Sequence, residues 1–312
     1  MIESDGQHSW TGAELMSDER WRIDATPALE SDLAALLAWA TEREEPLREI
    51  QASSLSLPGF DQVVAQARGA LGTDGLGAAL ISGLPSDPDL AQLTYLAIAC
   101  RLGDPLKNYG RLYDVRDQGG SYLDAPIPVS QTRHTTSFHT DSARRETLPK
   151  IVSLLCLQDA RGGDSQLVSA SRVHEEMQRE APLLLDRLYQ DYIRDIVTPG
   201  TESTEEALLA NRFPVFQSRR DGTGLNFRYM RYWIEKGAER AGRGLESIDL
   251  EALDLLDSLL ADRSLYAQLH LQPGEALFID NRDIAHNRTP YVDHPGKSRH
   301  LVRMWLTDEQ VA

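Results

Sequence analysis

Apolar residues in the first hundred positions recur at helical spacing, apart from one continuous apolar run. The helices that this spacing predicts span residues 29–43, 60–71 and 87–102. The run 75–85 is bounded by glycine and proline, which is typical of a short buried strand. Residues 1–25 are polar and mixed, and we expect a loosely held arm there.

Beyond residue 105 the pattern changes to short β-branched and apolar segments separated by glycine, proline and aspartate. The clearest strand among them is residues 151–157. Helical spacing returns in an insertion-like stretch, with helices predicted at 173–190, 203–209 and 250–261. Strands resume at 276–280 and 301–306. Strands on both sides of a helical insertion predict a mainly β protein of α+β type, with a β-sandwich or jelly-roll core.

These segments predict a single domain over residues 1–312. Along the chain it divides into an N-terminal helical extension, a first core half, a helical insertion and C-terminal core strands, at residues 1–70, 71–170, 171–265 and 266–312. The sequence shows no internal repeat and no low-complexity tract. A core of this size is large enough to enclose a buried pocket.

The charge of the chain argues against large anionic partners. Lysine and arginine number 32 against 48 aspartate and glutamate residues, which gives a formal net charge of −16. A chain this acidic is a poor candidate for binding nucleic acid or an anionic membrane surface. We therefore expect a small-molecule partner. The sequence does not indicate the oligomeric state.

Several features predict a cytoplasmic protein without a membrane segment. No apolar run approaches the length of a membrane span, and residues 1–5 are acidic and polar, unlike a secretory signal. Cys100 and Cys156 are the only cysteines, and both have apolar neighbours. Buried free thiols in a reducing compartment are the simplest interpretation.

The strongest chemical signal is a histidine and an aspartate two positions apart, with another histidine far downstream. His139 and Asp141 stand in the sequence Thr-Ser-Phe-His-Thr-Asp-Ser, and residues i and i+2 of a strand share a face. Taken alone, such a tripeptide is usually a surface hydrogen-bonding group. Here His286 follows the strand predicted at 276–280 and precedes several arginines. This set matches the two-histidine, one-carboxylate centre of mononuclear Fe(II) enzymes, which leaves metal positions open for a co-substrate and dioxygen.

Other histidines compete with His286 for the third ligand position. His134 comes five residues before His139, and we expect it at the surface or behind the ligands. His174 lies on a predicted helix beside two glutamates, so we expect it to be solvated. Turn, loop and strand contexts argue against the remaining candidates, His270, His294 and His300.

Residues 281–305 form a basic stretch inside the acidic chain, with five basic residues against two aspartates. Arg299 and Arg303 are four positions apart, so on a strand they share a face with Leu301 between them. A guanidinium matches a carboxylate with two parallel hydrogen bonds. We expect Arg299 to anchor the distal carboxylate of 2-oxoglutarate, and Arg303 to hold a substrate anion or brace the pocket. Apolar neighbours weaken the alternative of two surface arginines that balance an acidic protein.

Five motifs occur in order along the chain. They are the run 75–85; Leu102-Gly103-Asp104-Pro105-Leu106 with Gly110 and Tyr113; Phe138-His139-Thr140-Asp141; Gly162-Gly163-Asp164-Ser165; and Asp280-Asn281-Arg282 leading to His286 and Arg299-His300-Leu301-Val302-Arg303. Over roughly residues 70–306, this combination resembles the taurine dioxygenase superfamily of Fe(II)/2-oxoglutarate-dependent dioxygenases, and within it the clavaminate synthase-like branch. The resemblance implies a double-stranded β-helix, a distorted jelly roll, with helical insertions. It also implies Fe(II), 2-oxoglutarate and dioxygen as cofactors.

Carried over residue by residue, the resemblance implies that His139, Asp141 and His286 bind the iron. Many members of the clavaminate branch have glutamate where this chain has Asp141, which puts the exact subgroup in doubt. Halogenating relatives have glycine or alanine at that position, leaving room for chloride. The aspartate therefore predicts oxygenation or desaturation rather than chlorination.

The resemblance also assigns residues to the co-substrate. It implies that Arg299 pairs with the far carboxylate of 2-oxoglutarate, and that Arg303 faces the carboxylate of the co-substrate or the substrate. Ser165 stands where many relatives have a threonine that hydrogen-bonds the co-substrate. A turn residue after Gly-Gly-Asp is an equally good interpretation of Ser165.

Substrate contacts follow from the same resemblance. Relatives carry an arginine-tyrosine segment near the active site, so Arg228 and Tyr229 are candidates, although core packing explains them equally well. Asn108 is a further candidate for substrate contact. Together with Tyr109, and with residues 116–134, it is also a candidate for a lid over the site. The branch favours amino acids and amino-acid-derived natural products, and a cyclic dipeptide or another small secondary metabolite is the nearest alternative.

The predicted reaction is hydroxylation, desaturation or cyclisation at an unactivated C–H bond. Two alternatives remain at the level of sequence. One is a metal-binding or ligand-binding jelly roll without turnover, and the other is a metal-assisted hydrolase or isomerase on a cupin-like barrel. Those last enzymes usually use more histidines and need no basic anchor for a co-substrate.

Overall fold

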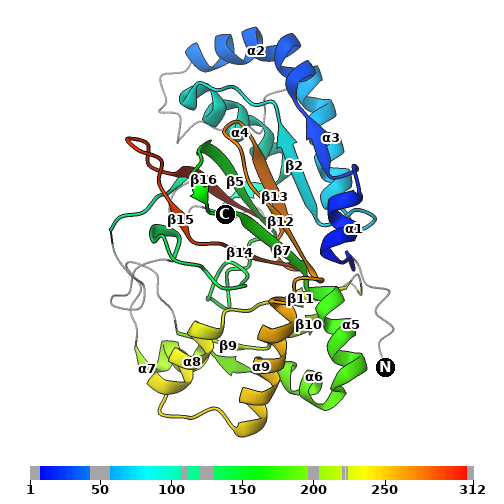
Figure 1. Ribbon diagram of the computed structural model, residues 1–312, viewed down its shortest axis with the longest axis vertical. Coiled ribbons are helices and arrows are strands. Elements are labelled where there is room, and N and C mark those ends of the chain that lie inside the picture. The colour runs from blue at the N-terminus through cyan, green and yellow to red at the C-terminus, as the bar shows by residue number, and fades with distance from the viewer. Residues whose placement is uncertain are drawn as a thin grey trace.

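The computed structural model describes residues 8–42, 57–106, 112–119, 129–195, 204–219, 222 and 224–307. Within these stretches the centre of the molecule is built from two β-sheets, with helices outside them (Figure 1). Side chains from both sheets line one cavity, so the two sheets form its walls.

The larger sheet has seven strands within the described part of the chain. In spatial order they are β1 (Arg22–Asp24), β2 (Ala78–Ser82), β13 (Ala276–Asp280), β5 (Ile151–Gln158), β16 (His300–Thr307) and β3 (Asp104–Pro105), with β4 (Tyr113–Val115) also on β16. β1 pairs with β2 in parallel, and the other pairs are antiparallel. Strands from the two ends of the chain thus lie side by side, as a jelly roll requires.

The second sheet faces the cavity from the other side. It consists of three antiparallel strands, β12 (Tyr266–Leu269), β7 (Ser165–Ser169) and β14 (Ile284–Arg288). Three further antiparallel pairs are β6 (Arg161–Gly162) with β15 (Tyr291–Val292), β8 (Tyr192–Ile193) with β9 (Arg212–Phe213), and β10 (Phe216–Ser218) with β11 (Leu225–Phe227). A short 3₁₀ helix spans Val129–Gln131.

The helices of the N-terminal part are α1 (Gly12–Ser17), α2 (Thr26–Thr41), α3 (Pro58–Leu71) and α4 (Pro88–Leu102). α3 and α4 pack on the larger sheet, α2 packs on α3, and α1 packs on β12 of the second sheet. α4 begins after Asp87, whose side chain accepts a hydrogen bond from the backbone N–H of Leu90. It is buried on almost every side and packs on β5 and β16. The Tyr95 hydroxyl lies 2.6 Å from the Ser153 hydroxyl of β5 and ties the helix to the sheet.

A second group of helices surrounds the other sheet. It comprises α5 (Ala170–Glu180), α6 (Pro182–Leu188), α7 (Glu205–Ala210), α8 (Arg231–Arg240) and α9 (Ser247–Leu260). α5, α6 and α9 share their own apolar core with β10 and β11. Figure 1 shows this group at one end of the molecule and α2, α3 and α4 at the other. The cavity between the sheets is lined by apolar residues of the main core, such as Leu167 and Leu277, and by Tyr229 of this second core.

Most elements predicted from periodicity occur in the structure. The helices predicted at 29–43, 60–71 and 87–102 correspond to α2, α3 and α4. The strand at 276–280 is β13, and 301–306 lies within β16. The division of the chain at residues 70, 170 and 265 stays a prediction.

The prediction of a loose arm over residues 1–25 is wrong for its described part, residues 8–25. Trp10 and Trp21 are almost completely buried, and their indole N–H groups donate to the carbonyls of Leu76 and Leu15. β1 adds this segment to the edge of the larger sheet. The two tryptophans anchor the segment although their sequence neighbours are polar. Because each is isolated, they create no apolar periodicity in the sequence.

The single helix predicted at 173–190 is in fact two, α5 and α6, because Pro182 cannot continue a helix and starts the second one. The prediction of a solvated His174 is also wrong. Its side chain is buried, and its Nε2 lies 2.8 Å from the hydroxyl of Tyr189 on the turn after α6. The bend between α5 and α6 encloses the histidine.

Cys100 and Cys156 are buried and free, as predicted. Among the described residues, none of the helices combines the length and apolar character needed to cross a bilayer.

Candidate metal centre and its cavity

His139 and His286 face each other across an isolated antiparallel bridge. The backbone N–H of His139 donates to the carbonyl of His286 at 3.0 Å, and the reverse bond is 2.9 Å long. The two imidazole rings have centroids 4.4 Å apart. This bridge joins the loop that carries His139 to β14, and so brings together two residues that are far apart in the sequence.

Asp141 is positioned by Asn281, which follows β13 and is completely buried. The Asn281 side chain accepts a hydrogen bond from the Asp141 N–H at 2.7 Å and donates one to the Asp141 carbonyl at 3.1 Å. A side-chain amide thus pairs with the backbone of Asp141 as a neighbouring strand would. The end of β13 therefore determines where the carboxylate lies.

The three side chains converge on one point. One ligand atom each from His139, Asp141 and His286 lies within 4.8 Å of the other two. The Oδ1 atom of Asp141 is 3.6 Å from the Nε2 of His139 and 3.9 Å from the Nε2 of His286. Metal–ligand bonds of about 2.1 Å place adjacent ligand atoms about 3 Å apart, so one ion fits with a small contraction.

Neighbouring groups leave the correct atoms free for a metal. The Nδ1 of His139 lies 2.9 Å from the Ser137 carbonyl, to which it donates when protonated, and this leaves Nε2 as the lone-pair donor. The Oδ2 of Asp141 accepts hydrogen bonds from the Trp305 indole at 2.6 Å and from Arg303 at 3.2 Å. Only Oδ1 remains to bind as a single-oxygen ligand. The sequence did not single out Trp305, although it continues the alternation Arg299, Leu301, Arg303.

The electrostatic surroundings favour the metal-binding protonation states. Burial and the neighbouring His139 lower the pKa of His286 to about 3, so this imidazole is neutral at physiological pH. Burial acts to raise the pKa of Asp141, but Arg303 and the two imidazoles outweigh it and hold the pKa below its ordinary value. A neutral imidazole and a charged carboxylate are the forms that bind metal ions.

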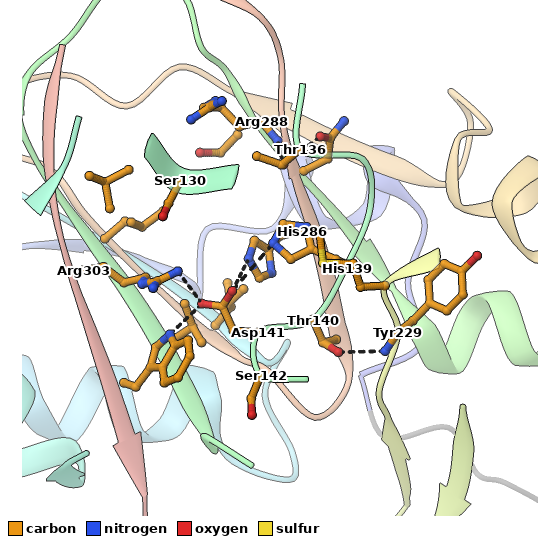
Figure 2. Close-up of a pocket in the computed structure, with 18 of the residues that line it drawn as sticks. Ser130, Thr136, His139, Thr140, Asp141, Ser142, Tyr229, His286, Arg288 and Arg303 are labelled. Carbon is orange, nitrogen blue, oxygen red and sulfur yellow. Dashed lines mark hydrogen bonds and ion pairs between the residues drawn. The ribbon is translucent and has the colours of Figure 1, made fainter. Parts of the chain in front are cut away.

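A cavity of about 180 Å³ surrounds the three residues. Arg299, Leu301, Arg303 and Trp305 all line it, which confirms that the two arginines share a face. Apolar residues of β5 and β13 complete that wall, namely Val152, Leu154, Leu277 and Ile279. Figure 2 shows Asp141, His139 and His286 at its centre, with Arg303 beside Asp141. The site is therefore a cavity with one polar centre and a partly apolar wall.

Arg299 is buried and has an unused donor. Its Nη2 donates to the Gly163 carbonyl at 3.3 Å, whereas its Nη1 has no hydrogen-bond partner. The guanidinium lies over the Tyr291 ring, and burial lowers its pKa. Ser165, at the start of β7, is buried and lines the same cavity. A buried cation with a free N–H fits the distal carboxylate of 2-oxoglutarate.

Arginines dominate the charged residues of the cavity. Among the described residues, the cavity is lined by six arginines and one carboxylate, that of Asp141; the arginines are Arg144, Arg194, Arg228, Arg288, Arg299 and Arg303. Of the basic stretch 281–305, Arg282 instead pairs with Asp280 at 2.7 Å, and Lys297 is exposed. Arg288 belongs to the basic stretch singled out in the sequence, whereas no site role for Arg144 or Arg194 was evident there. Arg144 and Arg194 stand at no regular sequence spacing from the motifs that contain the proposed metal ligands, so the sequence pattern does not indicate them.

Arg228 and Tyr229, the candidates for substrate contact, both line the cavity but differ in their hydrogen bonds. Arg228 lines the cavity and donates to the carbonyls of Arg144, Arg145 and Thr147. Tyr229 also lines it, but its hydroxyl donates to Asp257 at 2.6 Å and points away from the metal ligands (Figure 2).

The predicted lid falls mostly outside the described part of the chain. Asn108 and Tyr109 lie outside the described residues, as do residues 120–128 of the stretch 116–134. Their roles stay predictions.

The other histidines lie apart from the cluster. His134 is exposed, as expected. His270 and His300 make their closest contacts with Asp164 and Asp114, at 2.7 and 2.8 Å. Within the described residues, the cluster around His286 is the one group of histidine, cysteine and acidic side chains that could hold a metal ion.

Comparison with known proteins identifies the family. The family described as "Taurine catabolism dioxygenase TauD, TfdA family" matches residues 43–305. The chain belongs to this family. The resemblance seen in the motifs is thereby confirmed at the level of the family.

Two curated relatives extend the match over most of the chain. FR-33289 synthase from Streptomyces rubellomurinus is 25% identical over 97% of this chain and 90% of its own length. A uridine-5'-phosphate dioxygenase from an Amycolatopsis species is 29% identical over 73% of this chain and 83% of its own length.

Solved structures share the fold. Asparagine oxygenase in complex with Fe(II), 3-hydroxyasparagine and succinate has a TM-score of 0.71 at 20% identity, covering 92% of this chain and 94% of its own. The non-haem iron oxygenase OrfP, in complex with Fe and alpha-ketoglutaric acid, has a TM-score of 0.66 at 16% identity with the same coverage. The fold is therefore the double-stranded β-helix of these oxygenases, as predicted.

Family membership decides between the alternatives left open by the sequence. The TauD-family protein is an enzyme, an Fe(II)- and 2-oxoglutarate-dependent oxygenase, and its cofactors are Fe(II), 2-oxoglutarate and dioxygen. Two of the neighbouring solved structures are complexes with small molecules, 3-hydroxyasparagine with succinate and 3-hydroxy-L-arginine.

Proposed function

We propose that this TauD-family enzyme holds Fe(II) with His139, Asp141 and His286 and hydroxylates, desaturates or cyclises an unactivated C–H bond. The substrate that we propose is an amino acid or an amino-acid-derived natural product. One observation carries the assignment: three ligand atoms converge within 4.8 Å in a cavity that also contains an unpartnered N–H of Arg299. A facial set of three ligands leaves room for a co-substrate and dioxygen.

The co-substrate is assigned to the wall formed by β7 and the start of β16. Arg299 would bind the distal carboxylate of 2-oxoglutarate through Nη1, and Ser165 would offer a hydroxyl to the same carboxylate. Arg303, held between the rings of Tyr113 and Trp305, would keep Asp141 charged and oriented.

The protein's own residues provide orientation and exclude water. When bound, iron and 2-oxoglutarate supply an oxidation in which decarboxylation of the co-substrate is coupled to removal of hydrogen from the substrate. The apolar residues of β5 and β13 keep water from the reacting carbon. Because Asp141 occupies the position that chloride needs in halogenating relatives, we propose oxygenation or desaturation rather than chlorination.

The relatives' names support small polar substrates but differ in kind. Asparagine oxygenase is crystallised with 3-hydroxyasparagine, and OrfP with 3-hydroxy-L-arginine. Two relatives are named uridine-5'-phosphate dioxygenase. A cyclic dipeptide or other secondary metabolite stays the alternative. We also propose a cytoplasmic location, in keeping with two buried free cysteines.

The test of the reaction is formation of succinate from 2-oxoglutarate under air, with added Fe(II) and ascorbate. We expect succinate that depends on Fe(II) and increases with a panel of amino acids and peptide-derived metabolites. The His139→Ala variant should form none. Absence of Fe(II)-dependent succinate from the wild-type protein with every panel member would contradict the proposal.

A further inference from the structure

We propose that the cavity recognises its substrate through a phosphoryl-type dianion, either a phosphate monoester or a phosphonate. Arg144 would bind this group, and the charges of Arg194 and Arg228 would support it. This inference rests on the proposed function, because it names the substrate class for the same site. It assigns the anion to a wall other than the one that holds 2-oxoglutarate.

Arg194 and Arg228 form a buried pair of like charges. Both guanidinium groups lie 3.8 Å from the centroid of the Phe213 ring, and their exposed fractions are 2% and 8%. Burial is the main cause that lowers the pKa of both, and the charge of Arg228 adds to it for Arg194. Burying a positive charge away from water is unfavourable in free energy unless an anion or polar groups compensate for the lost hydration.

The hydrogen bonds of this pair go to neutral groups. Arg194 donates to the backbone carbonyls of Tyr192, Phe213, Pro214 and Arg228, and Arg228 donates to those of Arg144, Arg145 and Thr147. These carbonyls offset the desolvation of the donors but carry no net negative charge. The carboxylates of Asp191 and Glu146 also act on Arg194 and Arg228, but neither residue lines the cavity. The wall therefore projects positive potential into the cavity.

Two donors in this wall are unused. The Nε atoms of Arg144 and Arg228 are buried and have no hydrogen-bond partner. A buried donor without an acceptor is disfavoured, and such groups in native structures usually meet a ligand, an ion or water. Both residues line the cavity. An oxyanion in the cavity would supply the missing acceptor.

The loop that carries Arg144 is fixed in place. Ser142 donates to the Thr147 carbonyl at 2.6 Å, and Arg228 bonds to the carbonyls of Arg144 and Thr147. Ser142 directly follows Asp141, the proposed metal ligand, in the sequence. Arg144 therefore stands close to Asp141 in the sequence, on a loop whose backbone is held by hydrogen bonds. A residue that orients a substrate must be held in this way.

This wall differs from the one assigned to 2-oxoglutarate. Arg288 and Arg299 both stack on the ring of Tyr291. Their guanidinium carbons lie 5.1 and 4.9 Å from the ring centroid. Figure 2 shows Arg288 on one side of the metal ligands and Ser142 on the other. Because one dicarboxylate is assigned to the Arg299 wall, the cations beside Ser142 need an anion of their own.

The cavity also lacks a partner for an ammonium group. Asp141 is the one carboxylate among the described residues that line it, and its Oδ2 is taken by Trp305 and Arg303. A free amino acid would place its ammonium group among arginines, so within the proposed class the inference favours amino-acid-derived substrates that carry a phosphoryl group. A phosphoryl group offers three oxygens and up to two negative charges, which several guanidinium groups match better than one carboxylate.

Calorimetric titration of the intact protein tests this inference, using inorganic phosphate, methyl phosphate and methylphosphonate as probes. Acetate and L-asparagine serve as comparisons at the same ionic strength, with and without saturating 2-oxoglutarate. We expect at least one phosphoryl probe to bind about tenfold more tightly than acetate or L-asparagine, a difference of about 1.4 kcal/mol. Preference for methyl phosphate identifies an ester, and preference for methylphosphonate identifies a phosphonate. Equal or weaker binding of all three probes would overturn the inference.

A pair of neighbouring variants locates the site. Arg144→Gln should weaken the best probe about tenfold, and Arg144→Lys should weaken it less because the charge remains. Arg145→Gln removes the same charge one position away, from an exposed residue that does not line the cavity. Equal effects of the two glutamine substitutions would overturn the proposed site. These titrations need no iron, so their outcome is independent of the succinate assay that tests the proposed function.

Discussion

The indole N–H of Trp305 donates to the Oδ2 of Asp141 at 2.6 Å. This bond, together with that from Arg303, leaves one oxygen of the carboxylate facing the two imidazoles. β16 thus determines which oxygen of Asp141 is available to a metal. Hydrogen bonds of this kind, behind the ligands, commonly affect metal affinity as strongly as they affect orientation.

Trp305→Phe keeps the aromatic ring and removes the donor. We expect Fe(II) affinity to fall about tenfold, measured by anaerobic titration of the metal-free protein. Trp10→Phe is the matched control, because that indole donates to the Leu76 carbonyl and does not line the cavity. An iron affinity equal to wild type in Trp305→Phe would show that the bond plays no part in metal binding.

Arg299→Lys should raise the KM for 2-oxoglutarate about tenfold or more, because a lysine cannot make two parallel bonds to a carboxylate. Steady-state assays at saturating Fe(II) measure this. Arg282→Lys is the control, since Arg282 pairs with Asp280 outside the cavity and should leave the KM unchanged. A KM that is unaffected in Arg299→Lys would remove Arg299 from the co-substrate site.

Asn281→Ala should destabilise the protein and weaken the metal site together. The substitution removes the acceptor for the Asp141 N–H and the donor to the carbonyls of Asp141 and Pro149. Buried groups left without partners cost about 1–3 kcal/mol, so we expect a loss of about that size in the free energy of unfolding. Urea unfolding with and without Fe(II) measures both effects. If stability falls but Fe(II) stabilises the variant as much as wild type, Asn281 does not position the ligand.

The buried pair of His8 and Asp283 predicts a dependence of stability on pH. Burial acts to lower the pKa of His8, but bonds to Asp283 and to the Gly72 carbonyl outweigh it, and the pKa is raised. The folded protein then holds the proton more tightly than the unfolded chain. Its contribution to stability is complete below the ordinary histidine pKa of about 6.5 and is lost as pH rises through the raised value.

Urea unfolding between about pH 5.5 and 8.5 spans the ordinary histidine pKa and tests this prediction. The free energy of unfolding of His8→Gln should fall less over that range than that of the wild-type protein. His134→Gln, at an exposed position, is the control and should follow the wild type. Parallel curves for wild type and His8→Gln would show that the pair is not linked to folding.

The arginine pair was predictable because it follows strand geometry, whereas the proposed metal ligands His139 and Asp141 lie on a loop outside the strands. Arg299 and Arg303 share a face through simple alternation, which one sequence displays directly. The interval between Asp141 and His286 has no such rule. His286 was chosen because it follows a predicted strand and precedes several arginines, and the resemblance to a family implied the same residue. The structure then shows the backbone bridge that brings His139 to His286.

Other parts of the site depend on contacts that no local pattern encodes. Arg194 and Arg228 come from separate segments and meet on the Phe213 ring. Asn281 reaches across to the backbone of Asp141, although its sequence neighbours predict only the end of a strand. Such side chains become recognisable only when distant segments are brought together by the fold.

The central claim is that His139, Asp141 and His286 hold one ferrous ion to which 2-oxoglutarate can bind. Anaerobic titration of the metal-free protein with Fe(II) and 2-oxoglutarate tests it directly, by the weak visible charge-transfer absorption of the chelate. The account predicts the band in wild type and in His134→Ala, and its loss in His139→Ala and in His286→Ala. A wild-type protein without the band, or a band that survives in both ligand variants, would contradict the account.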